Sequence, residues 1–199
     1  MMRFVLQAEP SSFDEECRKK GREWLATHKD YNGRPRDYWS RFEPELRTAF
    51  GTFCAYSAVR IPKGEVDHFI SIESMKSTDQ HHLAYEWSNY RYSDSTINKR
   101  KPRKESEHSI LDPFAVQDDW FDIDLHSLQL RLADKVPEEI RGDAQFTIER
   151  LGLIDDDYVC RYRRELLDMY LDGKLTLDGL REWAPIIARA VESNPDFKR

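Results

Sequence analysis

The sequence predicts an α+β fold, in which a small β-hairpin and one helix form a core embedded in a mostly helical domain. Three observations lead to this prediction. Stretches near both ends carry apolar residues at helical spacing and begin at helix-capping residues. The middle of the chain contains short β-prone segments separated by turn residues. A run of good N-cap residues follows the last of these segments, which favours a helix after the strands.

Residues 1–50 are expected to form an N-terminal helical segment. Residues 12–15 read Ser-Phe-Asp-Glu, the pattern of a capping box, and apolar residues follow at helical spacing. Gly33 and Pro35 lie in a loop that ends this helix. Asp37 can cap a second helix, whose apolar face is mostly aromatic.

Residues 51–104 are expected to form the hairpin-and-helix core. Two segments here are β-prone, Thr52 to Arg60 and Glu65 to Ile70. Pro62-Lys63-Gly64 is the expected turn between them. The sequence therefore predicts a hairpin that closes at this turn.

Two further elements complete the predicted core. Residues 82–92 fit a helical turn that runs into a strand. A helix is then expected to start within residues 93–96 and to carry Asn98. Pro102 would end this helix or lie just beyond it.

Residues 105–199 are expected to form a mixed and then helical C-terminal region, a candidate for partner docking. Alternating apolar residues from Trp120 to Leu132 predict two strands. Pro185 lies inside the last predicted helix, so a kink or a break is expected there. The helices expected in this region cover residues 144–153, 155–170 and 176–191.

The charge of the chain limits the classes of function. The formal net charge is -6, which argues against a simple nucleic-acid coat protein, because such proteins are usually basic. Six basic residues and one acid lie between Arg91 and Lys104, whereas eight acids and three bases lie between Gln117 and Asp143. A local basic surface beside an acidic one is expected, and the alternative for such a run is a solvated face.

Targeting and redox features indicate a cytoplasmic protein. No stretch approaches the ~20 apolar residues that a membrane span needs. The first residues also lack the apolar region of a signal peptide. The chain has three widely spaced cysteines, and an odd number predicts free thiols rather than a disulfide framework.

Asp67, His68 and Asn98 have the side-chain types that hydrolysis of a phosphodiester bond requires. A neutral imidazole can take the proton of an attacking water near pH 7, which suits His68. A divalent cation, Mg²⁺ or Mn²⁺, stabilises charge on the phosphate and prefers oxygen ligands such as those of Asp67 and Asn98. Adjacent side chains of a regular strand point to opposite faces, so the two roles are expected to be split at a strand end.

A basic run follows Asn98 on the predicted helix. Helix N-terminal amides favour a nearby phosphate, and basic side chains can contact the phosphates that flank a cut. A simpler explanation is that Asn98 is a helix-capping residue and that the Asp-His pair is incidental. The residues expected to contact nucleic acid are Lys99, Arg100, Lys101, Arg103 and Lys104.

The spacing of these residues resembles the motif of the HNH (ββα-metal) nucleases. The sequence reads Val-Asp-His-Phe-Ile over residues 66–70, then Asn89, then Asn98 nine residues later, followed by Lys-Arg-Lys. The resemblance covers residues 54–101, about a quarter of the chain. It implies a small ββα-metal core with metal-dependent endonuclease activity.

The resemblance also implies a role for each residue of the motif. Asp67 matches a metal ligand, and His68 matches the general base. Asn89 matches the residue that holds the loop and orients the base. Asn98 matches the residue that completes the metal site.

Segments on both sides of the motif resemble bacterial HNH proteins grouped with PtuB, the nuclease subunit of the Septu antiphage system. The resembling segments are residues 35–56, 85–89, 111–113 and 147–153. This wider resemblance implies an antiviral defence nuclease that acts on nucleic acid, with DNA favoured. It also implies an ATPase as partner protein.

One departure from the family concerns zinc. Many members brace the fold with two Cys-x-x-Cys pairs. Cys54 keeps one cysteine of the first pair, whereas Ser57, Asp94 and Ile97 occupy the other three positions. A closed zinc site needs four ligands, usually Cys or His, so no structural zinc is expected.

Two alternatives to a nuclease stay open. The chain can be a non-catalytic nucleic-acid-binding or interaction module that retains the HNH fold. It can also be an unrelated helical adaptor, in which Asp67 and His68 are incidental. Metal-dependent cleavage that is lost in His68→Ala would exclude the first alternative. A structure that places Asp67, His68 and Asn98 far apart would establish the second.

Overall fold

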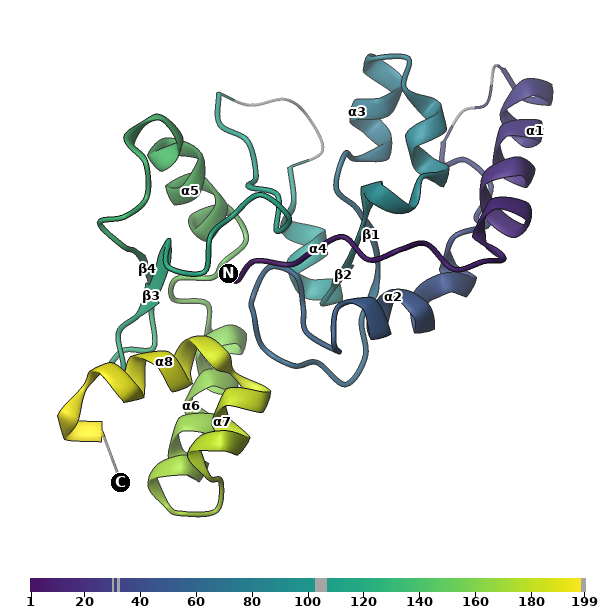
Figure 1. Cartoon of the computed structure of the whole chain (residues 1–199). Coiled ribbons are helices and arrows are strands. Elements are labelled where there is room, and N and C mark those ends of the chain that lie inside the picture. The colour runs from purple at the N-terminus through teal and green to yellow at the C-terminus, as the bar shows by residue number, and fades with distance from the viewer. Residues whose placement is uncertain (30, 32, 103–106, 198–199) are drawn as a thin grey trace.

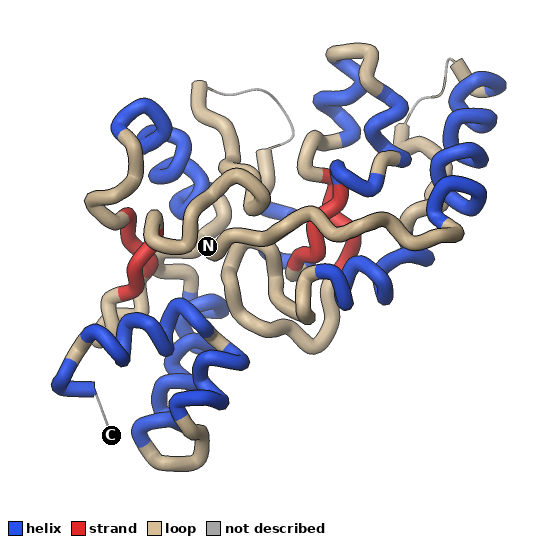
Figure 2. Tube along the Cα trace, in the orientation of Figure 1, coloured by secondary structure: helices blue, strands red, loops and turns tan. Residues whose placement is uncertain are grey.

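The computed structural model describes residues 1–29, 31, 33–102 and 107–197. Within these residues the chain forms helices and two antiparallel sheets of two strands each, so the predicted α+β class is confirmed. Figure 1 shows two lobes side by side, the first built from the N-terminal half of the chain and the second from the C-terminal half. Each lobe contains one of the two short sheets (Figure 2).

The first lobe carries a strand–strand–helix unit. Its sheet pairs β1 (Glu65–His68) with β2 (Tyr90–Ser93), and the helix α4 (Ser95–Arg100) follows directly. Asp94 caps α4 by accepting hydrogen bonds from two backbone amides of its first turn, so the predicted helix start is confirmed. The other elements of this lobe are the π-helix η1 (Asp14–Lys19), the helices α1 (Lys20–Thr27), α2 (Glu43–Ala49) and α3 (Ile72–Ser77), and the 3-10 helices η2 (Ser40–Phe42), η3 (His81–Tyr85) and η4 (Trp87–Asn89).

The hairpin partner of β1 differs from the sequence prediction. Residues 52–60, which were expected to be a strand, form a loop with an isolated bridge between Phe53 and Arg60. Thr52 and Ala58 in this loop have φ angles of 68° and 56°. A strand cannot continue through residues in this left-handed region. The hairpin is therefore formed by β1 and β2, and a long helical connection joins them.

The second lobe follows the sequence prediction more closely. Its sheet pairs β3 (Phe121–Ile123) with β4 (Leu130–Leu132), within the segment that alternates apolar and polar residues. The expected break at Pro185 is confirmed, since one helix ends two residues before it and the next begins at it. The helical elements of this lobe are α5 (Glu138–Arg150), α6 (Asp157–Leu171), α7 (Leu177–Trp183), α8 (Pro185–Ser193) and η5 (Pro195–Phe197).

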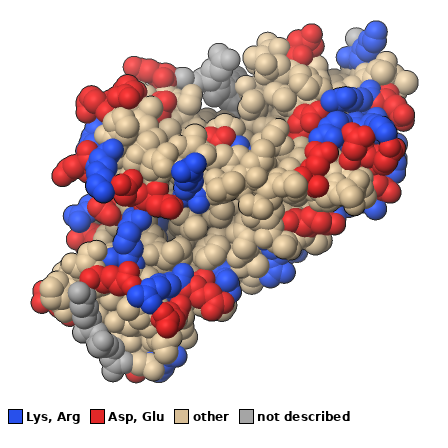
Figure 3. Space-filling view, viewed as in Figure 1, with Lys and Arg blue, Asp and Glu red and all other residues tan. Residues whose placement is uncertain are grey.

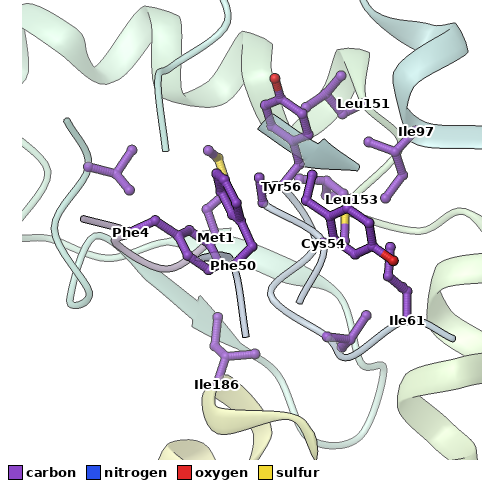
Figure 4. Packing of buried hydrophobic residues seen from close by; sticks show 14 of the residues in the cluster. Met1, Phe4, Phe50, Cys54, Tyr56, Ile61, Ile97, Leu151, Leu153 and Ile186 are labelled. Carbon is purple, nitrogen blue, oxygen red and sulfur yellow. The ribbon is translucent and has the colours of Figure 1, made fainter. Parts of the chain in front are cut away.

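A hydrophobic cluster joins the two lobes (Figure 4). The members labelled in Figure 4 come from the first residues of the chain, residues 50–61, α4, the connection between α5 and α6, and α8. Each fully buried large apolar side chain contributes ~1.5–3 kcal/mol to stability. Ile97 of α4 belongs to this cluster and is 1% exposed. Packing of Ile97 therefore anchors α4 against the rest of the core.

The surface carries charges of both signs. Figure 3 shows Lys and Arg side chains interspersed with Asp and Glu at the two ends of the molecule, with a mostly uncharged centre on this face. None of the helices in the described part of the chain combines the length and the apolar character that crossing a bilayer requires.

Candidate functional site

The β1–β2 hairpin, α4 and the residue that follows α4 bring five of the predicted site residues to one pocket: Asp67, His68, Asn98, Lys99 and Lys101. Asp67 and His68 are the last two residues of β1, where they lie opposite Arg91 and Tyr90 of β2. Asn98 lies in the middle of α4, and its Nδ2 donates to Glu65 Oε1 at 2.7 Å. The far-apart placement that would establish the helical adaptor is therefore not observed, since Asp67, His68 and Asn98 all line one pocket.

The pocket has a volume of about 570 Å³. A pocket of similar volume, about 610 Å³, lies in the second lobe beside β3, but none of the predicted site residues lines it. Apart from His68, the charged side chains of the described residues that line the first pocket are four carboxylates and three cations. They are Asp37, Glu65, Asp67 and Glu73 against Arg34, Lys99 and Lys101.

His68 is held as a neutral ring. Its Nε2 lies 3.0 Å from the carbonyl oxygen of Ala84, which can only accept, so Nε2 carries the proton and Nδ1 keeps its lone pair. The ring packs edge-on against Trp39 and Tyr90, with centroids 4.7 and 5.2 Å away. Burial lowers the pKa of His68 from its usual 6.5 to about 4, because a buried charge is poorly solvated. The ring is therefore neutral throughout the physiological range, with Nδ1 as its unprotonated nitrogen.

The carbonyl of Ala84 was not predicted as part of the site. It also accepts a hydrogen bond from the Tyr90 hydroxyl at 2.7 Å. Burial raises the pKa of Tyr90 well above 10, so this hydroxyl stays protonated and keeps donating. A side-chain motif gives no signal for a backbone carbonyl, so the orientation of His68 was open until the fold was known.

Asn89 braces the backbone around His68. Its Oδ1 accepts from the amide of Ile70 at 2.8 Å, and its Nδ2 donates to the carbonyls of Ile70 and Leu83 at 3.3 and 3.1 Å. Ile70 follows β1, and Leu83 directly precedes Ala84. Asn89 therefore ties the end of β1 to the turn that orients the His68 ring, which is the role that the motif implies for it.

Asp67 is buried, and both oxygens of its carboxylate accept hydrogen bonds from neighbouring side chains. It is 3% exposed. Its Oδ2 accepts from the Tyr56 hydroxyl at 2.5 Å, and Lys101 Nζ lies 2.8 Å from Oδ1 and 2.7 Å from Oδ2. Burial lowers the pKa of Lys101, and the Asp67 charge opposes this shift.

The basic run after Asn98 does not form one exposed, phosphate-facing surface. Lys101 is 8% exposed and pairs with Asp67. Arg100 pairs with Asp156 at 2.5 Å and so ties α4 to the second lobe. Arg100 and Lys101 were predicted to be exposed contacts to nucleic acid, and this prediction is wrong for both. Lys99 is exposed at the pocket, whereas Arg103 and Lys104 lie outside the described residues.

The donor chemistry around Asp67 suits a hard cation. The Lys101 ammonium has four oxygens within 3.3 Å, two from the Asp67 carboxylate and one each from the carbonyls of His68 and Phe69. Carboxylate and carbonyl oxygens are the ligands that Mg²⁺ and Mn²⁺ take in proteins. Among the described residues no three His, Cys, Asp or Glu side chains are arranged around one point. A divalent ion at Asp67 would therefore need the carbonyls of His68 and Phe69, Asn98 or water as further ligands.

Two of the four positions compared above with a zinc knuckle, Cys54 and Asp94, make hydrogen bonds here. Cys54 is buried, and its Sγ lies 3.5 Å from the amide of Asp94. Besides capping α4, the Asp94 carboxylate accepts from the Tyr158 hydroxyl of α6 at 3.0 Å. Asp94 therefore links the hairpin unit to the second lobe.

Comparisons with known proteins add no family to this geometry. No protein-family model and no curated protein sequence matches the chain. The functional argument therefore rests on the pocket: Asp67, His68 and Asn98 line it, and Asn89 braces the backbone behind it.

Proposed function

We propose that this chain is an endonuclease of the HNH type, which hydrolyses phosphodiester bonds of nucleic acid. The observation that carries the proposal is the arrangement of Asp67, His68 and Asn98 around one pocket on a strand–strand–helix unit. The spacing of the HNH motif requires such an arrangement. The hydrogen bonds of Asn89 to the backbone on both sides of His68 support it further.

His68 is the proposed general base. As water attacks phosphorus, His68 Nδ1 takes a proton from the water, a new oxygen–phosphorus bond forms, and the bond to the leaving sugar oxygen breaks. The leaving oxygen then takes a proton from solvent. Since the carbonyl of Ala84 fixes the Nε2–H tautomer, the ring always presents the basic nitrogen at Nδ1.

Asp67 and Asn98 are the proposed ligands of a divalent ion, Mg²⁺ or Mn²⁺. When bound, such an ion supplies positive charge that stabilises the phosphate and the leaving oxygen. Such an ion would also offset negative charge among the described residues of the pocket, which include four carboxylates and three cations. Lys99 and Arg34, both exposed at the pocket, are the proposed contacts to flanking phosphates.

The biological setting that we propose is antiviral defence in the cytoplasm, with DNA as the favoured substrate and an ATPase as partner. This part of the proposal rests on the resemblance to PtuB-type proteins. The candidate docking surface lies on α6 and α7, where the large apolar side chains of Met169, Leu171 and Trp183 are exposed. If a partner docks there, charged substitutions at Met169 and Trp183 should abolish co-purification and leave the melting temperature unchanged.

A non-catalytic nucleic-acid-binding module is the second candidate. One observation favours it: His68 is 6% exposed and the Asp67 carboxylate is already paired with Lys101, so the site is closed. Such a module would bind nucleic acid without cutting it. It would bind equally well with Ala at position 68.

The experiment that tests the proposal is incubation of purified protein with plasmid DNA, single-stranded DNA and RNA. Each substrate is incubated with Mg²⁺, with Mn²⁺ and with EDTA. The proposal predicts strand cleavage that requires a divalent ion and that is absent in EDTA. Binding without cleavage of any substrate, in the presence and absence of the proposed partner, would favour the second candidate.

A further inference from the structure

We propose that Lys101 is an internal cation that competes with the divalent ion for the Asp67 carboxylate. This inference rests on the proposed function, in which Asp67 is a metal ligand. It adds to that function a residue of the same chain, Lys101, that lowers the affinity of the site for the divalent ion. The sequence assigned Lys101 to phosphate binding, and the structure places it at the centre of the site instead.

The surroundings of Lys101 Nζ form a complete binding site for a cation. Four oxygens lie 2.7–3.3 Å away, although an ammonium has only three N–H groups to donate. The rings of Tyr56 and Phe69 lie on other sides, each with its centroid 5.5 Å from Nζ. Nothing in this environment is specific for an ammonium, since the same oxygens suit a hard metal ion.

The Lys101 ammonium and a divalent ion cannot both use the Asp67 carboxylate fully. Nζ contacts both carboxylate oxygens, and the Tyr56 hydroxyl takes a further position on Oδ2. Two cations on one carboxylate repel each other strongly where burial removes the screening by water. A metal ion that binds Asp67 must therefore displace Lys101.

The competition also explains why a lysine is buried here. An unpaired carboxylate at the burial of Asp67 is strongly destabilising, so a protein without bound metal needs a positive charge at this position. Lys101 supplies that charge from the end of α4, the helix that also carries Asn98. The same contact that stabilises the fold thus lowers the affinity for the divalent ion.

Titration of Mn²⁺ into the protein without nucleic acid, followed by calorimetry, tests the inference. Lys101→Met keeps the length of the side chain and removes its charge. It should bind Mn²⁺ about tenfold more tightly than the wild type, within the usual range of coupling between sites. Lys101→Arg, which keeps the charge, should bind as weakly as the wild type.

Lys99→Met is the matched control. Lys99 lies on the same helix and lines the same pocket, but it is exposed. Its removal changes the general electrostatics of the pocket without freeing Asp67, so the affinity should change by less than about twofold. The double variant Asp67→Asn with Lys101→Met should lose the gain in affinity, because the ligand itself is weakened.

A measurement on the wild type covers the case in which Lys101→Met does not fold. In a nuclear magnetic resonance spectrum of the lysine ammonium groups, Lys101 should give a slowly exchanging, ion-paired signal. Saturating Mg²⁺ should abolish or shift this signal. A Lys101 signal that stays unchanged at saturating Mg²⁺ would overturn the inference, and so would equal Mn²⁺ affinities of folded Lys101→Met and wild type.

These outcomes are separate from those of the proposed function. Tighter Mn²⁺ binding by Lys101→Met, together with no cleavage of any substrate, would support the competition and contradict the nuclease. Metal-dependent cleavage with equal affinities would support the nuclease and contradict the competition.

Discussion

The two hairpins of this protein have the same charged pair at their centre and use it in opposite ways. In the first hairpin Asp67 lies opposite Arg91, and in the second Asp122 lies opposite Arg131. The side chain of Asp67 is 4% exposed, whereas that of Asp122 is 47% exposed. The cross-strand pattern is therefore the same, but only the first hairpin buries its charges.

The buried side chains of Asp67 and Arg91 in the first hairpin bind residues outside the sheet. Arg91 makes a bidentate ion pair with Asp112 and stacks over Phe114, with its Cζ 3.7 Å from the ring centroid. The Asp67 carboxylate forms an ion pair with Lys101 and accepts a hydrogen bond from the Tyr56 hydroxyl. A fold does not need buried charges in a two-stranded sheet, and the second hairpin is built around buried apolar side chains. The two hairpins therefore differ in that the first depends on buried ion pairs and the second on buried apolar side chains.

The largest difference between the hairpins is expected for removal of the aspartates. Asp67→Ala should destabilise the protein by about 3–5 kcal/mol, because it leaves the buried Lys101 ammonium unpaired. Asp122→Ala should change stability by less than about 0.5 kcal/mol, because this side chain is half exposed. Urea denaturation of the two variants measures both values.

A double variant sharpens this comparison. Asp67→Ala combined with Lys101→Met should recover much of the lost stability, since neither charge then remains unpaired. Equal effects of Asp67→Ala and Asp122→Ala would show that the buried ion pair contributes nothing.

The pH dependence of stability should also distinguish the hairpins, since only the first contains a histidine in its strands. The pKa of His68 is about 4 in the folded protein and about 6.5 when unfolded, so the unfolded state binds more protons between these values. Stability from this group is therefore complete above pH 6.5 and is lost as the pH falls towards 4. The loss should be on the order of 1–3 kcal/mol.

His68→Gln provides the control for this measurement. Subtraction of its stability curve from that of the wild type removes the contribution of all other groups. A flat difference curve between pH 4 and 7 would mean that His68 is accessible to protons in the folded state.

Removal of the Asn89 brace should have a smaller effect. Asn89→Ala should cost about 1–2 kcal/mol, because it removes the partner of the Ile70 amide and carbonyl, while the Leu83 carbonyl keeps its hydrogen bond from the Glu86 amide. In the second hairpin, Ile123→Val should cost about 0.5–1.5 kcal/mol, since it removes one buried methylene. Thermal melts provide both values, and the reverse order would contradict a structural role of the Asn89 amide.

The smallest effect is expected at the exposed cations. If Lys99 contacts phosphates, Lys99→Glu should lower the salt dependence of nucleic-acid binding by about one unit of slope. Arg131→Glu, on the exposed face of the second hairpin, should leave the slope unchanged. Fluorescence anisotropy at several salt concentrations measures the slope, and equal slopes for the two variants would place the bound nucleic acid elsewhere.

The same comparison shows what the sequence could predict. The start of α4 at Asp94 and the β3–β4 strands follow from local capping and alternation. The capping box expected at residues 12–15 is not formed, since η1 begins after Phe13 without a side-chain cap. The spacing of Asp67, His68 and Asn98 correctly indicated one shared pocket. The partner of β1 was predicted wrongly, because the left-handed residues Thr52 and Ala58 give no propensity signal.

Contacts that depend on tertiary packing were also beyond prediction. Lys101 belongs to a basic run, and a charge run normally forms a solvated face. Its burial follows from the position of α4, which Ile97 anchors in the core. The carbonyl of Ala84 that orients His68 carries no side-chain signature. The His68–Ala84 and Lys101–Asp67 contacts each join residues that are 16 or more positions apart in the chain.

In the proposed function, His68 is the general base of a nuclease. The single-turnover rate of nucleic-acid cleavage by the wild type and by His68→Ala, measured side by side in saturating Mn²⁺, tests this role. We expect a rate lower by about 10²- to 10⁴-fold in His68→Ala, with nucleic-acid binding retained. Equal rates in the two proteins, with both folded, would exclude His68 as the general base.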